Sequence, residues 1–419
     1  MQAVNVEIPG AVVEGQCDPQ WQDVLDVFVQ NFRTRNERGA SLCIRHEGET
    51  KIDVWGGVGN ASGQPWARNS VSVVFSATKG ATAICAHILA SRGELDLNAP
   101  VTKYWPEYAK HGKGETTVAM LLNHSAGVPG FRKPVPREAF ADWDYVVRRI
   151  EDEEPWWEPG LRNGYHLINI GWTVGEVVRR ISGQSLGTFF QNEVAKPLGI
   201  DFWLGLPEEN ESQVIDVEPY IPGQFWDLKD DPLPKLVAEQ PDHLAALAIT
   251  NMGGFIEFDP ETGNYGPNER VFHAAEIGGA GGITNGRGLA HMYDPLANGG
   301  GKLVSRDHVW RMSAVSMIAQ PDLILRIPTR FGLGFMKAMD NRHIWGDDFQ
   351  SLLIGDRAFG HVGAGGSLGM ADPDCGLAFG YTMNRMGPGS LLNPRGQALV
   401  DATYKHLGYR SNAGGVWAR

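Results

Sequence analysis

Cysteine is scarce in this sequence, and long apolar stretches are absent. Four of the 419 residues are cysteines, none in a C-x-x-C pair, and Cys43 and Cys85 lie within apolar runs, which favours buried reduced thiols over disulfides. No apolar run approaches the roughly 18 residues of a membrane span. Residues 1–15 lack a basic stretch followed by an apolar one, so we expect no secretory signal. These absences predict a cytoplasmic protein.

Basic runs and cofactor motifs are also missing. The chain has 37 basic and 49 acidic residues and a net charge of −12, so nucleic acid and anionic membranes are not expected partners. The 12 histidines form no H-E-x-x-H motif and no cysteine–histidine cluster at zinc spacing. There is no G-x-x-x-x-G-K-[ST] loop and no strand-linked G-x-G-x-x-G. We therefore expect no metal, nucleotide or dinucleotide cofactor.

Hydrophobic residues make up 42% of the chain and aromatic residues 10%, which is typical of a globular protein with a large core. Strand patterns occur towards both ends, whereas residues 102–268 are helical and rich in loops, including a proline-rich connection over 222–241. This order predicts an α+β domain built from both ends, with a mostly helical insertion. The predicted strands are residues 41–46, 51–58, 331–336, 367–371 and 376–384, and the predicted helices are 21–35, 172–181, 186–194, 391–407 and one that follows a glycine-rich turn at 278–282 and ends near Met292.

The most informative motif is Ser76-Ala77-Thr78-Lys79, which follows an apolar extended run and begins a helix. Residues three apart on a helix share one face, so Lys79 can accept the proton of Ser76 if the pKa of the lysine is lowered. The first helical turn also favours developing negative charge. The motif predicts a serine nucleophile with a lysine base, and an N-cap serine beside a solvated lysine is the structural alternative. Five apolar residues continue the helix at helical spacing: Ala81, Ile84, Cys85, Ile88 and Leu89.

Two later segments carry further candidates. Tyr165 follows a Pro-Gly turn, where a tyrosine near cations can act as a general base or proton relay, or can be purely structural. Residues 360–366 contain His361 and four glycines, which let the backbone approach a ligand closely. A main-chain N–H in this segment can form an oxyanion hole with the N–H of Ser76. A twisted hairpin with a structural histidine is the alternative.

Two other serines fit nucleophile patterns less well. Ser367 lies in Gly-Gly-Ser-Leu-Gly, but that motif needs a strand before it and a helix after it, whereas a strand and a turn are predicted here. Ser125 adjoins His124, and adjacent side chains rarely point at one another. We therefore favour Ser76 over both.

Taken in order, S-A-T-K at 76–79, Tyr165 after Glu-Pro-Gly, and His-Val-Gly at 361–363 resemble the three motifs of the class C β-lactamase-like serine hydrolases, especially the family VIII carboxylesterases. This resemblance implies an antiparallel sheet flanked by helices and a mostly helical second domain, with the site between them. We expect residues 1–101 and 269–419 to form the first domain and residues 102–268 the second.

The resemblance also implies roles for individual residues. Ser76 would be the nucleophile, Lys79 its activating partner and Tyr165 the proton relay to the leaving group. The N–H of Ala364, which follows Gly363, would face that of Ser76, and His361 would stand where many members carry lysine.

Two departures from the β-lactamase pattern suggest the substrate. Leu167 stands where that pattern has asparagine, and His-Val-Gly replaces Lys-Thr-Gly. Both changes remove groups that would hold a β-lactam, so we expect a carboxylesterase acting on small to medium, apolar esters. An acyltransferase, an amidase or β-lactamase, and a catalytically silent binding protein remain alternatives. The sequence does not indicate the oligomeric state.

Overall fold

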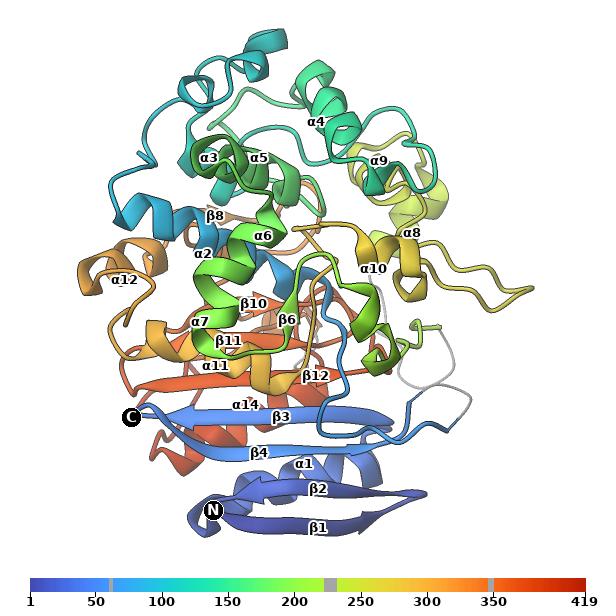
Figure 1. Cartoon of the computed structure of the whole chain (residues 1–419), viewed down its shortest axis with the longest axis vertical. Coiled ribbons are helices and arrows are strands. Elements are labelled where there is room, and N and C mark those ends of the chain that lie inside the picture. The colour runs from blue at the N-terminus through green and yellow to red at the C-terminus, as the bar shows by residue number, and fades with distance from the viewer. Residues whose placement is uncertain (60–62, 222–231, 346–349) are drawn as a thin grey trace.

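The computed structural model describes residues 1–59, 63–221, 232–345 and 350–419 (Figure 1). Its centre is a seven-stranded sheet in which every neighbouring pair of strands is antiparallel. From one edge to the other the strands are β1 (Gln2–Ile8), β2 (Ala11–Cys17), β4 (Glu49–Gly57), β3 (Gly39–His46), β12 (Leu377–Met383), β11 (Leu368–Asp372) and β10 (Phe359–Val362).

Helices cover both faces of this sheet, because the central strands are apolar on both sides. On one face α1 (Gln22–Thr34) and α14 (Pro394–His406) pack against each other and against one apolar cluster. On the other face α11 (Gly286–Ala297) lies across β3, β11 and β12. Gly286 and Gly380 allow this close contact, since a Cβ on Gly380 would lie 2.1 Å from the carbonyl oxygen of Gly286.

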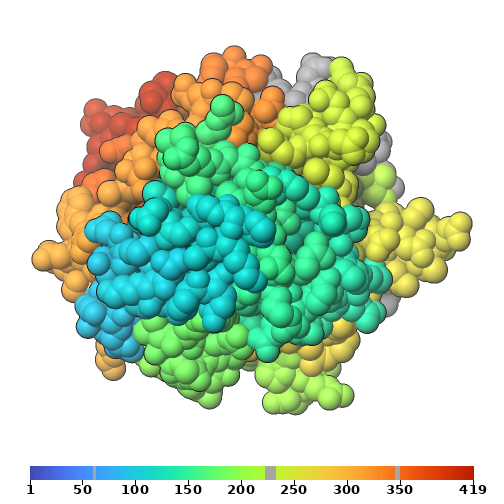
Figure 2. All heavy atoms as spheres, turned by 90° about the horizontal axis from the view of Figure 1, so that it is seen from above, coloured from blue at the N-terminus to red at the C-terminus, as the bar shows by residue number. Residues whose placement is uncertain are grey.

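The central helix is α2 (Thr78–Ser91), which is buried on all sides from Thr78 to Leu89. It packs against α5 (Ile170–Ser182), α6 (Leu186–Phe190), α12 (Arg306–Ser313) and β10. Figure 1 places α3, α4, α5 and α9 at the end of the molecule away from β1, and Figure 2 shows the middle of the chain dominating that end. The remaining elements are α3 (Val118–Leu122), α4 (Trp143–Asp152), α7 (Lys196–Leu198), α8 (Pro232–Glu239), α9 (Leu244–Thr250), α10 (Arg270–Ala274), α13 (Arg342–Trp345), β5 (Ser72–Val73), β6 (Phe202–Trp203), β7 (Ile283–Thr284), β8 (Met317–Ala319) and β9 (Thr329–Phe331).

The predicted fold class is confirmed: an antiparallel sheet is flanked by helices, and the middle of the chain is mostly helical. The helix over 186–194 is interrupted by a π-helical turn at Gln191–Ala195, and the helix expected to end near Met292 continues to Ala297. The prediction of a strand over 331–336 is wrong after Phe331, where β9 ends. The chain turns back there, and Met336 pairs with both Phe331 and Gly360. Half of the predicted connection at 222–241 lies outside the described residues, and the other half differs from the prediction because it contains the helix α8.

The β1–β2 hairpin was not predicted. Its signal is present, since Val4, Val6 and Ile8 alternate with polar residues before a Pro9-Gly10 turn. No helix in the described ranges is long and apolar enough to cross a membrane. The cytoplasmic location and the domain boundaries stay predictions.

Candidate active site

Ser76 lies in a single turn of 3-10 helix, Phe75–Ala77, that leads directly into α2. Its side chain is partly exposed, although Phe75 and Ala77 on either side are buried. As the second residue of a helix, Ser76 has an N–H without an intrahelical acceptor. Phe75 has a φ of +44°, a strained conformation for a residue other than glycine, which is typical of functional sites.

Lys79 is buried, and three oxygen atoms surround its Nζ. These are Ser76 Oγ at 2.9 Å and the carbonyl oxygens of Leu167 at 2.6 Å and Gly279 at 2.7 Å. The carbonyls can only accept hydrogen bonds, so a neutral Lys79 amine donates both its hydrogens to them and directs its lone pair at Ser76 Oγ. Burial lowers the pKa of Lys79 well below its usual range, and none of the ion pairs among the described residues involves this lysine. The arrangement is that of a base beside a hydroxyl.

The glycine-rich turn before β7 brings the Gly279 carbonyl to Lys79. A Cβ on Gly279 would lie 2.3 Å from the carbonyl oxygen of Ile168, so only glycine fits against the start of α5. Thr82 Oγ1 donates a hydrogen bond of 2.7 Å to the Gly278 carbonyl and anchors the turn on α2. The sequence predicts the glycine-rich turn, but no local pattern in it indicates the contact with Lys79.

Tyr165 lies over Lys79, whose Nζ is 4.6 Å from the centre of the tyrosine ring. The ring also contacts the rings of His124 at 4.7 Å and Phe331 at 5.8 Å between centres. Burial raises the pKa of Tyr165 above its usual range, and a side-chain hydrogen bond with Ser76 opposes this shift. The hydroxyl therefore stays protonated at neutral pH and can act as a proton donor.

His361 is fully buried and contacts Tyr165. Its Nδ1 lies 2.7 Å from the carbonyl oxygen of Val362, so Nδ1 carries the hydrogen and Nε2 faces the Tyr165 hydroxyl at 3.4 Å. Burial, with a smaller effect from the charge of Lys79, lowers the pKa of His361 to about 3. The residue is a neutral imidazole next to the predicted proton relay.

The turn between β10 and β11 lies against the segment that carries Ser76. A Cβ on Gly363 would lie 2.1 Å from the carbonyl oxygen of Val74, two residues before Ser76. Ala364 is partly exposed, and no hydrogen bond among the described residues uses its N–H. An N–H that is free in this position fits the predicted second donor of an oxyanion hole.

Known proteins that are similar to this chain identify its family. The family model named Beta-lactamase matches residues 26–403. The chain belongs to the beta-lactamase family. It is 32% identical over 399 residues to the esterase/beta-lactamase LipL of Mycobacterium tuberculosis, covering 90% of this chain and 84% of that protein. The resemblance predicted from the three motifs is thus confirmed.

Two solved structures share the fold over almost their whole length. A family VIII carboxylesterase superposes with a TM-score of 0.79 at 33% identity, over 94% of this chain and 99% of that one. A penicillin-binding protein homologue from Caulobacter crescentus gives a TM-score of 0.79 at 29% identity, with the same coverage. Two proteins with quite different names therefore share the architecture of this chain.

The other serines have structural partners. Ser367 is buried, its Oγ donates a hydrogen bond of 2.9 Å to the Val74 carbonyl, and β11 follows it, so the expected absence of a nucleophile elbow is confirmed. Ser125 Oγ donates to Asn123 Oδ1, while His124 Nδ1 accepts from the main-chain N–H of His166.

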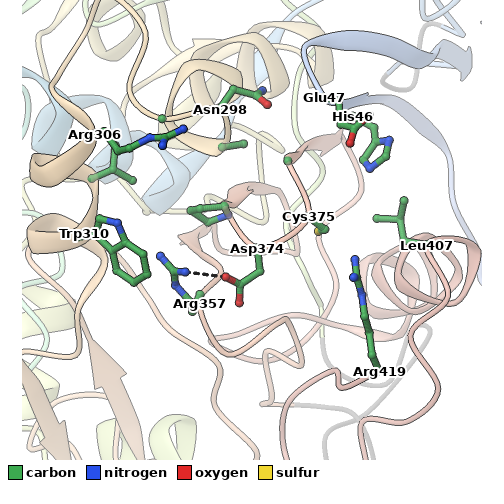
Figure 3. Close-up of a pocket in the computed structure, with 15 residues that line it drawn as sticks. His46, Glu47, Asn298, Arg306, Trp310, Arg357, Asp374, Cys375, Leu407 and Arg419 are labelled. Carbon is green, nitrogen blue, oxygen red and sulfur yellow. Dashed lines mark hydrogen bonds and ion pairs between the residues drawn. The ribbon is translucent and has the colours of Figure 1, made fainter.

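A polar pocket of about 690 Å³ lies apart from these residues, near the start of α12 (Figure 3). Arg357 and Asp374 form an ion pair of 2.8 Å within it, and Arg357 stacks on Trp310. Its cysteine, Cys375, has a pKa raised by burial to about 12, so its thiol stays protonated. Because this pocket contains no activated nucleophile, Ser76 is the stronger candidate in this member of the family.

Proposed function

We propose that the chain is a serine carboxylesterase that hydrolyses small to medium carboxylic esters through an acyl-enzyme on Ser76. The observation that carries this proposal is the position of Lys79 Nζ, 2.9 Å from Ser76 Oγ and held by two carbonyls. A buried lysine with a lowered pKa is the kind of group that activates a serine without histidine. The names of the relatives, which include esterase and carboxylesterase, support ester hydrolysis.

In the proposed acylation step, Ser76 Oγ attacks the ester carbonyl while its proton passes to Lys79. The N–H groups of Ser76 and Ala364 stabilise the negative oxygen of the tetrahedral intermediate. Tyr165 donates its proton to the leaving alcohol oxygen and regains one from Lys79. In deacylation, a water molecule repeats the attack on the acyl-enzyme with the same groups.

The substrate class follows from Leu167 and His361. Leu167 holds Lys79 through its carbonyl, and its side chain packs against both apolar clusters, so it presents no amide to a substrate. The neutral, buried His361 offers no cation for a substrate carboxylate. Both features favour neutral, apolar acyl groups.

We also propose that the site lies between two domains, residues 1–101 with 269–419 and residues 102–268. Ser76, Lys79 and His361 come from the first, and Tyr165 and Leu167 come from the second. A small-molecule ester is the proposed partner, and a cytoplasmic location is the one the sequence favours. Transfer of the acyl group to an alcohol or amine instead of water is the nearest alternative within the same mechanism.

Mass spectrometry with nitrophenyl butyrate tests the proposal. We expect a transient butyryl adduct on the peptide containing Ser76, and neither adduct nor turnover in Ser76→Ala. Ser367→Ala is the matched control, since it removes a buried serine close to the site and should keep most of the activity. An active Ser76→Ala enzyme would refute the assignment. Failure of the wild-type chain to form an adduct or product would favour a non-catalytic member of the family.

A further inference from the structure

Asp322 is a fully buried carboxylate outside the three motifs, and it contacts the main chain of Tyr165. The Tyr165 N–H lies between its two oxygens, 3.1 Å from Oδ1 and 3.0 Å from Oδ2. The N–H groups of Ile324 and Leu325 donate to Oδ1 at 2.8 and 2.9 Å, and Thr329 Oγ1 lies 3.4 Å from Oδ2. Three main-chain amides thus point at one carboxylate.

None of the ion pairs between described residues includes Asp322, so the amide dipoles provide the compensation for burial. Burial raises the pKa of Asp322 to about 6, which leaves the group ionised at neutral pH. Its negative charge also contributes to the raised pKa of Tyr165 and so helps to keep that hydroxyl protonated.

The segment around Tyr165 depends on such contacts, because residues 162–166 belong to no helix or strand. On one side, the Gly164 N–H donates to the His124 carbonyl at 3.2 Å. On the other side, the Leu323 N–H donates to the Asn163 carbonyl at 3.1 Å, next to the contact between Asp322 and Tyr165. The segment that contains Asp322 therefore accepts a hydrogen bond from the Tyr165 N–H and donates one to the Asn163 carbonyl.

We infer that Asp322 is a positioning residue that holds the main chain of Tyr165 so that its hydroxyl can protonate the leaving alcohol. This inference rests on the proposed function, in which Tyr165 is the proton donor. The consequence is a dependence on the leaving group. An alkyl alkoxide leaves only with a proton, whereas nitrophenolate is stable enough to leave without one, so a displaced Tyr165 slows alkyl esters selectively.

Asp322→Ser is the sharpest variant. Serine accepts hydrogen bonds from main-chain N–H groups two and three residues ahead, so it can retain the turn at Ile324 and Leu325. Its side chain is too short to reach Tyr165 as well. Asp322→Asn is the second variant, since it keeps the shape but turns one oxygen towards Tyr165 into an N–H donor. The matched control is Asp372→Asn, another buried aspartate, which accepts from Tyr404 and has no contact with Tyr165.

The measurement is kcat/KM for ethyl butyrate and nitrophenyl butyrate on the same preparation of each variant. The ratio of the two values does not depend on the fraction of protein that is folded. In Asp322→Ser and Asp322→Asn we expect the ratio of ethyl to nitrophenyl ester to fall by about tenfold or more, as for loss of a general acid. In Asp372→Asn it should stay within about twofold of wild type. An unchanged ratio in both Asp322 variants overturns the inference.

A double-mutant cycle with Tyr165→Phe separates positioning from a general structural effect. If Asp322 acts through Tyr165, adding Asp322→Ser to Tyr165→Phe lowers the ratio no further. A further fall of the same size in the double variant overturns the inference. If Tyr165→Phe alone leaves the ratio unchanged, the proposed role of Tyr165 fails, and the inference about Asp322 fails with it.

Discussion

Three buried histidines should make this protein sensitive to acid. Burial lowers the pKa of His87, His166 and His361 to about 3, whereas an unfolded histidine has a pKa near 6.5. The unfolded state therefore binds more protons than the folded state between these values, and the free energy of unfolding falls as the pH drops below about 6.5. The stabilising contribution of the neutral rings is fully present only above that pH.

The size of the effect follows from the same pKa values. Lowering the pH from 7.5 to 5.0 should cost about 2 kcal/mol for each histidine, or about 6 kcal/mol for the three. Asp322 acts in the opposite direction, because its pKa is raised from 3.8 to about 6. Its protonation in the folded state offsets about 1 kcal/mol of this loss over the same pH range. The combined loss from these four groups, about 5 kcal/mol, is comparable to the whole stability of many proteins.

Urea unfolding at pH 7.5 and 5.0 and constant ionic strength measures this loss. The test variant is His87→Gln, since His87 lies away from Ser76, with its Nε2 2.8 Å from the Leu333 carbonyl and its Nδ1 2.9 Å from His308. Glutamine does not titrate, so the loss between the two pH values should shrink by about 2 kcal/mol. The exposed His343 is the control, and His343→Gln should leave the loss unchanged. Equal stability of the wild-type chain at both pH values would refute the reasoning.

Three further predictions concern the site. Lys79→Arg puts a cation that does not deprotonate in place of the proposed base, so kcat/KM should fall at least about 100-fold with an unchanged circular dichroism spectrum. Activity within about tenfold of wild type would exclude a base role. Because Leu167 and His361 lack the amide and cation for a β-lactam, kcat/KM for nitrophenyl butyrate should exceed that for nitrocefin by about 10³-fold or more, and similar values would contradict this. In Gly363→Ala the new Cβ would lie 2.1 Å from a carbonyl oxygen, so the free energy of unfolding should fall by about 1–3 kcal/mol. Gly114→Ala is the control, because no atom lies within 4 Å of its new Cβ, and it should leave the free energy of unfolding unchanged. Equal urea midpoints for Gly363→Ala and the wild type would contradict this prediction and show that the turn between β10 and β11 can move to make room.

Local pattern was sufficient where neighbouring residues decide the structure. The helix α1 and the β3–β4 hairpin follow their periodicity, and Gly183 ends α5 with a φ of +70°. The spacing of Ser76 and Lys79 predicted two side chains one helical turn apart, and the structure has them 2.9 Å apart. Local pattern was misleading at 331–336, where pairing with the distant Gly360 determines the backbone.

By itself the sequence determined the family, the fold class and which serine has a lysine one turn away, because these depend on short motifs and on the order of strands and helices. Only the tertiary structure decided the environment of that lysine. The carbonyls of Leu167 and Gly279, 88 and 200 residues away in the chain, accept both hydrogens of its neutral amine, and burial lowers its pKa. Asp322 likewise lies 157 residues from Tyr165. Packing brings such groups together, and the desolvation that changes their proton affinity exists only in the folded chain.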